Sequence, residues 1–294
     1  MRTIVDEPAW SDPVHRLLET GGTIFLLGGS DAGKTSLARY ILDQSIERGL
    51  RTAFLDGDIG QSSLGLPGTL SAAWFSTQRE LEAFTCGLMT YIGIVSPISD
   101  MGFLLHLLET MMNVCRRQSD IVVVDTTGFV SGDMARRFKA REIGVLNPDW
   151  IVSVQERDEL EPILQEVDPT ALIRLQRSSR VKIRNRRFRT NYRARKWRRY
   201  FDNVPLQTLE FDSSNVELHY RGTGIEPPLT SFFPGTLVGL NTGDITKAFG
   251  ILLPNSRSQV RLASPFQTKD RIDRLVLGDL LYPHPTRRSQ TRTI

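Results

Sequence analysis

Cysteine, histidine and long apolar runs are scarce in this sequence. Its 294 residues include 2 Cys and 4 His, and neither set has the spacing of a zinc site, a Ser-His-Asp triad or a Cys-x-x-Cys pair. We interpret Cys86 and Cys115 as buried thiols of a reducing compartment and the histidines as structural. No apolar stretch approaches the roughly 20 residues of a membrane span, and the first residues lack the apolar core of a signal peptide. We therefore expect a cytoplasmic protein without a membrane role.

Acidic residues are absent from one long segment. Between Arg174 and Arg199 the chain carries thirteen Lys or Arg and no Asp or Glu, which leaves 24 basic against 33 acidic residues elsewhere. The formal charge of +4 therefore conceals a basic element on an otherwise acidic protein. Such an element is suited to contact a polyanion. The remaining composition, 40% hydrophobic and 24% charged, is typical of a globular protein, here with one main domain and a smaller one.

A phosphate-binding motif is present near the amino terminus. Residues 28–35 have the complete pattern G-x-x-x-x-G-K-[ST], between an apolar run at 23–27 and a helical pattern at 35–44. A strand before the loop and a helix after it direct backbone N–H groups and the helix N-terminus at one anion. The alternative, a chance glycine-rich turn before an ordinary helix, would not require this combination of strand, spacing and Lys-Thr. Lys34 is expected to reach the β- and γ-phosphates of ATP or GTP, and the Thr35 hydroxyl to bind Mg²⁺. The expected nucleotide-binding residues are Gly28, Gly29, Ser30, Asp31, Ala32, Gly33, Lys34, Thr35 and Ser36.

Two carboxylates follow the next expected strand, at 51–55. Asp56 and Asp58 should lie at the carboxyl edge of a parallel sheet, where ligands bind. Acids two apart on an extended segment point the same way, so one can organise metal-bound water while the other accepts a proton from an attacking hydroxyl. By itself the Asp-x-Asp pattern also fits a loop cap.

A third acidic position follows the β-branched run at 121–124. Asp125, followed by Thr-Thr-Gly, fits the Walker B strand of a nucleotide-binding fold and would hold Mg²⁺ through water, assisted by Thr35. The alternative is an aspartate that ends a strand in a turn. Phe129 could form a wall over a substrate or simply pack in the core.

The acid-free segment interleaves bases with aromatic residues. At helical spacing Arg189 and Arg193 share one face, while Trp197 and Tyr200 could anchor the segment to the body. Three roles remain open for it. It could be an arginine lid that stabilises charge on a transferred phosphoryl group, a contact for nucleic-acid phosphates, or a solvated basic helix.

Alternating helical and strand patterns predict an α/β fold. We expect the P-loop NTPase fold, with a mostly parallel sheet flanked by helices, over residues 1–205, an arginine-rich lid at about 176–200, and a small β-rich C-terminal domain over 206–294. Predicted helices cover 13–20, 35–48, 103–117 and 159–166; predicted strands cover 23–27, 51–55, 89–95, 121–124, 150–154 and 171–175, followed by short β runs at 206–211, 216–220, 235–240, 249–253, 259–263 and 274–281.

In this order the motifs resemble the polynucleotide 5′-hydroxyl kinase family, which includes the RNA kinase of the eukaryotic pre-mRNA cleavage machinery, pre-rRNA-processing kinases and archaeal kinases. The resemblance covers about residues 20–205 well and the β-rich part more loosely. It rests on the phosphate loop, Asp56–Gln61 with Leu66-Pro67-Gly68-Thr69, Tyr91-Ile92-Gly93 through Ser96-Pro97, Asp125–Gly132, and Arg189-x-x-x-Arg193 before Tyr200-Phe201. Phe129 stands where relatives often carry Trp. The eukaryotic relatives carry an N-terminal β domain before the phosphate loop, where this sequence has about twenty residues, so we expect a minimal, bacterial or archaeal type of member.

The resemblance implies ATP-dependent transfer of a phosphoryl group to the 5′-hydroxyl end of RNA, or of DNA. Asp58 would be the general base, with Lys34 and Arg193 flanking the migrating group and Arg189 as the second lid arginine. Gln61 would help to position substrate or metal-bound water. The expected substrate contacts are Gln61, Ser96, Pro97 and Phe129, and the expected Mg²⁺ ligands are Thr35, Asp56 and Asp125.

Two other functions fit part of this pattern. One is an ATP-binding scaffold or assembly factor of RNA processing, which would need neither the base nor the lid. The other is a GTPase of the metallochaperone or partitioning type, although such proteins usually carry an N-K-x-D motif that this chain lacks. The biological pathway, protein partners and the role of the β-rich part are left open by the sequence.

Overall fold

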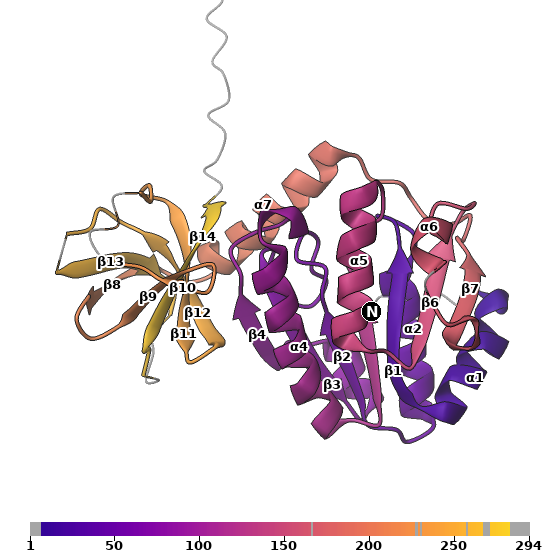
Figure 1. The fold of residues 1–294 in the computed structure, drawn as a ribbon. Coiled ribbons are helices and arrows are strands. Elements are labelled where there is room, and N and C mark those ends of the chain that lie inside the picture. Colours follow the sequence, from indigo (N-terminus) through magenta and orange to yellow (C-terminus); the bar gives the residue numbers. More distant parts are fainter. Residues whose placement is uncertain are drawn as a thin grey trace, which may run out of the picture.

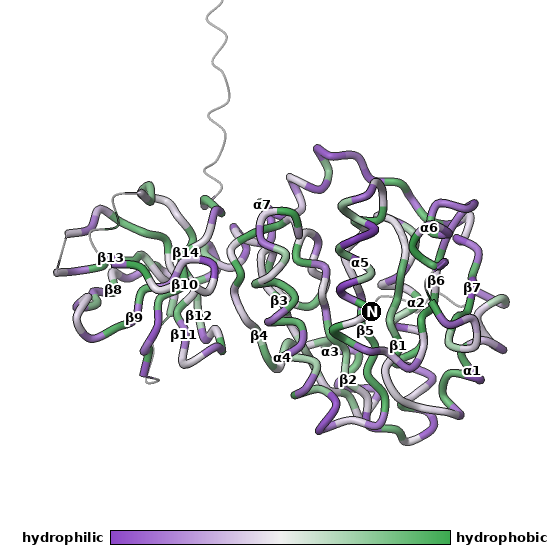
Figure 2. The backbone as a smooth tube through the Cα atoms, viewed as in Figure 1, coloured by the Kyte–Doolittle hydropathy of each residue, from purple (hydrophilic) through white to green (hydrophobic). Residues whose placement is uncertain are grey.

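The computed structural model describes residues 7–165, 167–226, 229, 231–256, 258–266 and 271–282. Its strands form two seven-stranded sheets, the first built from residues 22–176 and the second from residues 207–281, which lie next to each other (Figure 1). The strands are mainly hydrophobic, whereas hydrophilic residues are concentrated in the outer segments (Figure 2). No helix in the described part of the chain has the length and apolar character needed to span a membrane.

The first sheet is mostly parallel, as expected. Its strands lie in the order β4-β3-β2-β5-β1-β6-β7, and β3 alone runs antiparallel to both of its neighbours. The middle strand β5 is a continuous β-branched run that is buried on both faces, which suits the centre of a parallel sheet. The strand bounds are β1 Gly22–Gly28, β2 Thr52–Asp56, β3 Thr69–Phe75, β4 Leu88–Tyr91, β5 Ile121–Asp125, β6 Trp150–Gln155 and β7 Leu172–Gln176.

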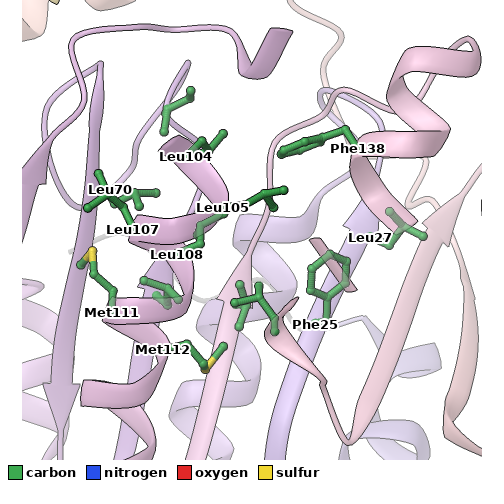
Figure 3. Close-up of a cluster of buried hydrophobic side chains, with 14 of the residues drawn as sticks. Phe25, Leu27, Leu70, Leu104, Leu105, Leu107, Leu108, Met111, Met112 and Phe138 are labelled. Carbon is green, nitrogen blue, oxygen red and sulfur yellow. The ribbon is translucent and has the colours of Figure 1, made fainter. Parts of the chain in front are cut away.

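Helices cover both faces of this sheet. One core joins it to α4, α5 and α6, and a second core joins the opposite face to α1, α2 and α3. Figure 3 shows Leu104, Leu108 and Met112 of α4 in the same buried cluster as Phe25 of β1. The helix bounds are α1 Ser11–Thr20, α2 Lys34–Glu47, α3 Gln78–Ala83, α4 Met101–Gln118, α5 Asp133–Leu146, α6 Glu161–Leu164 and α7 Arg186–Asp202.

The register of the sheet brings the acidic strand ends together. Asp56 at the end of β2 pairs with Asp125 at the end of β5, and Asp125 in turn lies opposite Leu26 of β1. The phosphate loop follows β1 directly. Three adjacent strands therefore deliver the loop and both aspartates to the carboxyl edge of the sheet, where ligands bind in open α/β folds.

The second sheet has the order β10-β9-β14-β11-β12-β13-β8 and its own apolar core. It is mostly antiparallel, with one parallel pair between β14 and β9. Its strands are β8 Gln207–Asp212, β9 Glu217–Tyr220, β10 Thr223–Gly224, β11 Thr236–Thr242, β12 Ile245–Leu252, β13 Gln259–Ser264 and β14 Arg274–Leu281.

The two sheets are joined by hydrogen bonds as well as by packing. The backbone N–H of Tyr91 in β4 donates to Thr246 Oγ1 at 2.8 Å, and the N–H of Asp279 in β14 donates to the Gly93 carbonyl at 2.8 Å. Helix α7 runs along the carboxyl edge of the first sheet and ends against the second (Figure 1). The second sheet is thus fixed beside the edge that carries the motifs.

The α/β fold with its C-terminal β sheet is confirmed, but β3, α3, α5 and the two-residue strand β10 escaped the sequence patterns. Strand β3 and helix α3 lie in a stretch for which no element was expected, and α5 fills another such stretch between the Walker B strand and β6. The alanine-rich β3 lacks a clear β signal, and α5 carries six charged residues among its fourteen, which obscures its apolar face.

Candidate active site

The phosphate loop is built as the motif requires. Gly33 adopts φ of 103°, a left-handed conformation that favours glycine, immediately before α2 begins at Lys34. The buried Lys34 Nζ donates to the carbonyl oxygens of Gly28 and Gly29 at 2.8 and 3.0 Å. Burial lowers the pKa of Lys34, while Asp125 and Asp58 raise it. The lysine is therefore held inside the loop, within the field of two carboxylates.

Asp125 and Thr35 face each other across the loop. Thr35 Oγ1 donates to Asp125 Oδ2 at 2.5 Å, and the buried Asp125 Oδ1 has no hydrogen-bond partner among the described residues. Burial raises the pKa of Asp125 to about 7, with Lys34 acting in the opposite direction. A buried carboxylate oxygen without a donor, beside a hydroxyl, is a donor set that fits Mg²⁺.

Asp56 takes a structural role that the sequence did not indicate. Its buried carboxylate accepts hydrogen bonds from the backbone N–H groups of Ser63 and Leu64, at 2.7 and 2.8 Å, and from the hydroxyls of Ser62 and Ser63. It also accepts the Asp58 N–H at 3.2 Å. These contacts organise the loop between β2 and β3. Asp56 as a metal ligand stays a prediction, and these hydrogen bonds within the protein favour a structural role for it instead.

Asp58 is presented differently, although it lies only two residues further on. Its Oδ1 accepts the N–H groups of Gly60 and Gln61, each at 3.0 Å, so Oδ2 takes no part in this turn. Asp58 and Gln61 line the same cavity as Lys34 and Asp125. Asp58, the expected proton acceptor, therefore faces the cavity over the phosphate loop, while Asp56 holds the loop between β2 and β3 in place.

The cavity over the phosphate loop has a volume of about 340 Å³. One side is formed by the loop and the aspartates, and the other by residues 178–184, the segment between β7 and α7. Trp10 lies at the same cavity, and Val181 approaches Gly33. The lining residues are Trp10, Ser30, Asp31, Ala32, Gly33, Lys34, Thr35, Ser36, Asp58, Gln61, Asp125, Ser178, Arg180, Val181, Lys182 and Arg184.

Helix α7 begins against the phosphate loop. The Arg184 N–H donates to Asp31 Oδ2 at 2.9 Å, and Arg189 Nη1 lies 3.7 Å from the same oxygen. Arg193 lies one turn further along: burial and Arg189 lower its pKa, while Asp58 raises it. Of the two expected lid arginines, Arg189 thus approaches the phosphate loop, whereas Arg193 lines no part of the 340 Å³ cavity and is linked to the expected base only by its electrostatic interaction with Asp58.

The same helix holds the loop that carries Asp58. Lys196 Nζ donates to the carbonyl oxygens of Ser62 and Gly65 at 2.6 and 2.7 Å, and Tyr192 Oη donates to Ser62 at 2.9 Å. Asp56 accepts hydrogen bonds from the N–H groups of Ser63 and Leu64 in the same loop. The loop is thereby fixed between a buried carboxylate and an ammonium group of α7.

The end of α7 is anchored by aromatic packing, as expected. Trp197 packs edge-on against Phe249 with ring centroids 5.0 Å apart, and Tyr200 Oη accepts the Phe249 N–H at 3.0 Å. Tyr91 of β4 belongs to the same cluster. Residues of α7, the first sheet and the second sheet therefore share one core.

The expected substrate contacts are spread along the same edge. Phe129 is half-buried and packs against Phe138 at 6.3 Å between ring centroids, which favours the packing alternative. Ser96 precedes the short 3₁₀ turn Pro97–Ser99, and Pro97 is buried. Of the four expected residues, only Gln61 lines the 340 Å³ cavity.

Comparison with known proteins identifies the family. The model of the family described as mRNA cleavage and polyadenylation factor CLP1 P-loop matches residues 28–203, which is more than half of the chain. The chain belongs to the CLP1 P-loop family. This confirms the resemblance drawn from the motifs.

Curated relatives of the family carry kinase names. The polyribonucleotide 5′-hydroxyl-kinase of Pyrococcus horikoshii is 32% identical over 193 residues, 65% of this chain and 53% of that protein. The enzyme of the same name from Thermococcus kodakarensis is 32% identical over 238 residues, 79% of this chain and 63% of that protein. The CLP1 homolog of Dictyostelium discoideum is 25% identical and covers 84% of this chain. The chain spans little more than half the length of these relatives.

The solved structure of Clp1p in complex with Pcf11p has the same fold. It superposes with a TM-score of 0.72 at 12% identity, covering 92% of this chain and 78% of that chain. The superposed region extends beyond the family match at residue 203, so it includes much of the second sheet.

Trp10 was not expected at the site, and within the lid segment expected at about 176–200 the sequence did not single out the residues that line the cavity or those that hold the Asp58 loop. Trp10 and the segment 178–184 line the nucleotide cavity, and Tyr192 and Lys196 hold the Asp58 loop. Lys196 and Tyr192 could not be distinguished from the other basic and aromatic residues of this segment by their type. A signal did exist, because Tyr192, Lys196 and Tyr200 follow one another at four-residue spacing and therefore share one helix face.

Proposed function

We propose that this chain transfers the γ-phosphoryl group of ATP to the 5′-hydroxyl end of RNA. The proposal rests on the position of Asp58, which lines the same cavity as Lys34 and Asp125. Asp56, by contrast, is hydrogen-bonded to the loop between β2 and β3. A nucleotide-binding scaffold needs a phosphate loop but has no use for a carboxylate held beside it. The kinase names of the relatives support the same activity.

The chemistry follows from the positions of these side chains. The 5′-hydroxyl oxygen forms a bond to the γ-phosphorus, the bond from that phosphorus to the β–γ bridging oxygen breaks, and Asp58 accepts the hydroxyl proton. Lys34 and Arg193, which approach Asp58 from two elements, would stabilise the charge spread over the transferred group. Positioning and electrostatics do most of the work in such a transfer.

Thr35 and Asp125 would hold Mg²⁺ in this scheme. The ion would offset charge on the β- and γ-phosphates when bound. The nucleotide itself would place its phosphates at the loop and its base toward Val181 and Trp10, where the cavity is least polar.

The test is transfer of label from γ-labelled ATP to a short 5′-hydroxyl RNA and to its DNA counterpart. Asp58→Asn keeps the Oδ1 acceptor for Gly60 and Gln61, so the variant should bind ATP almost normally and lose about 10²–10⁴ in rate. Asp12→Asn, an exposed change in α1, serves as the matched control. ATP binding without transfer by the wild-type protein would contradict the proposal and favour the scaffold function.

A further inference from the structure

A second cavity lies on the side of α7 that faces the second sheet. Its volume is about 160 Å³, and it is lined by four separate elements. Pro67 and Val95 come from the loops that follow β2 and β4. Arg193, Ala194 and Trp197 come from α7, and Leu280 and Leu281 from the end of β14.

The cavity is connected to the expected base through one compact loop. Gly60, two residues after Asp58, lies directly against the Val95 carbonyl, and the Gly68 N–H donates to the Ile59 carbonyl at 2.8 Å. The wall residue Pro67 is therefore tied to the turn that presents Asp58. Arg193 lines this cavity and also lies within electrostatic range of Asp58. A group bound here would be adjacent to the reacting hydroxyl.

The lining of the cavity suits a flat apolar ring. Most of its walls are aliphatic, prolyl or indole groups, and the Thr190 hydroxyl at its rim already accepts a hydrogen bond from Arg193 at 3.3 Å. At about 160 Å³ it is smaller than the roughly 300–1,000 Å³ of a typical small-molecule site, so it fits one ring system and not a whole nucleotide. Leu281, at 56% exposure, leaves a large apolar side chain open at the mouth.

The charges around the cavity indicate what carries that ring. Arg186 and Arg189 lie close enough to Arg193 to lower its pKa, and the acid-free segment continues along the helix. Such surroundings attract the phosphates of a nucleic-acid strand and disfavour an apolar peptide or lipid tail. A base bound by apolar contact while its phosphates meet arginines is a usual mode for single strands.

We propose that this cavity binds the base of the 5′-terminal nucleoside of the acceptor strand, with Leu280 and Leu281 of the second sheet forming one wall. This inference rests on the proposed kinase function and gives the second sheet a part in the acceptor site. Because the walls offer few hydrogen-bonding groups, the site accepts any of the four bases with similar affinity.

The experiment measures binding of a 3′-labelled 5′-hydroxyl RNA in the presence of a non-hydrolysable ATP analogue. A second RNA lacks the base of its first nucleoside. We expect the wild-type protein to bind the abasic strand about tenfold more weakly, the range of one stacked base. Leu281→Ser should bind the complete strand about tenfold more weakly and the abasic strand as the wild type does. Leu206→Ser, another exposed leucine of the C-terminal part, is the matched control and should change neither affinity.

A third variant tests the cavity from its other side. Ala194→Leu fills the space from α7, so it should weaken binding of the complete strand and leave the abasic strand unaffected. Equal affinity of the wild-type protein for both strands would overturn the inference, even if the protein transfers phosphate. Base-dependent binding without any transfer would instead overturn the proposed kinase function and leave the cavity assignment intact.

Discussion

The two halves of α7 contain similar residue types, but they differ in how far these are buried and in what they contact. In residues 186–195 the arginines are partly or fully exposed, and even Phe188 is 43% exposed. In residues 196–202 Trp197 and Phe201 are buried at 3% and 1% exposure between the two sheets. Helix α7, which carries the expected lid arginines, is therefore not a free flap: its second half is part of the core, so the position of Arg193 is set by packing one turn away.

The largest effect is expected from the first half. Arg193→Ala should lower kcat by roughly 10³–10⁵, because an arginine that stabilises the transferred group contributes on that order. The unfolding midpoint should change little, since the side chain is only partly buried. The measurement is kcat at saturating ATP and RNA, beside a thermal unfolding curve.

Arg195→Ala is the matched control, because Arg195 is exposed on the same half and lines neither cavity. If Arg193→Ala changes only the apparent affinity for RNA and its salt dependence, the arginine anchors strand phosphates and does not act on the transition state.

The second half should show the opposite pattern. Trp197→Ala removes a side chain shared by α7, Tyr91 and Phe249, and should lower the free energy of unfolding by about 3–5 kcal/mol. Trp197→Phe, which keeps an aromatic ring, should cost clearly less. Denaturant unfolding of the three proteins measures this. A loss of activity with unchanged stability would show that the halves are not divided as described.

The same contrast explains what the sequence could and could not predict. The phosphate loop, Asp125 and the β strands around them follow from local patterns, because spacing and β-branched runs determine backbone geometry directly. Asp56 could not be told from Asp58, since their roles depend on which N–H groups a later loop presents. Likewise, only the packing of the second sheet brings Leu281 to the edge of the first.

Lys196 lies at the boundary between the halves and should have an intermediate effect. Lys196→Met removes the donor to the Ser62 and Gly65 carbonyls, so the Asp58 loop loses one of its supports, while Asp56 and Tyr192 remain. A displacement of about 1 Å in a catalytic group can cost up to roughly 10²-fold in rate. We expect a loss of about that size or less in kcat, with ATP affinity maintained. Lys196→Arg, which keeps a donor, should recover part of the rate; equal losses for both variants would argue against this support.

Tyr192→Phe should give the smallest effect, and its size depends on the lysine. The tyrosine and Lys196 both donate to the Ser62 carbonyl, so removal of one hydroxyl leaves that oxygen bonded. A single hydrogen bond of this kind contributes about 0.5–1.5 kcal/mol, and less where a second donor remains. In the Lys196→Met background the same change should cost more, because the carbonyl then loses its other donor. The four proteins form a double-mutant cycle in kcat/KM and in unfolding free energy. Additive effects would show that the two side chains support the Asp58 loop independently, whereas a coupling would show that the first half of α7 acts on the base through a contact shared with the second.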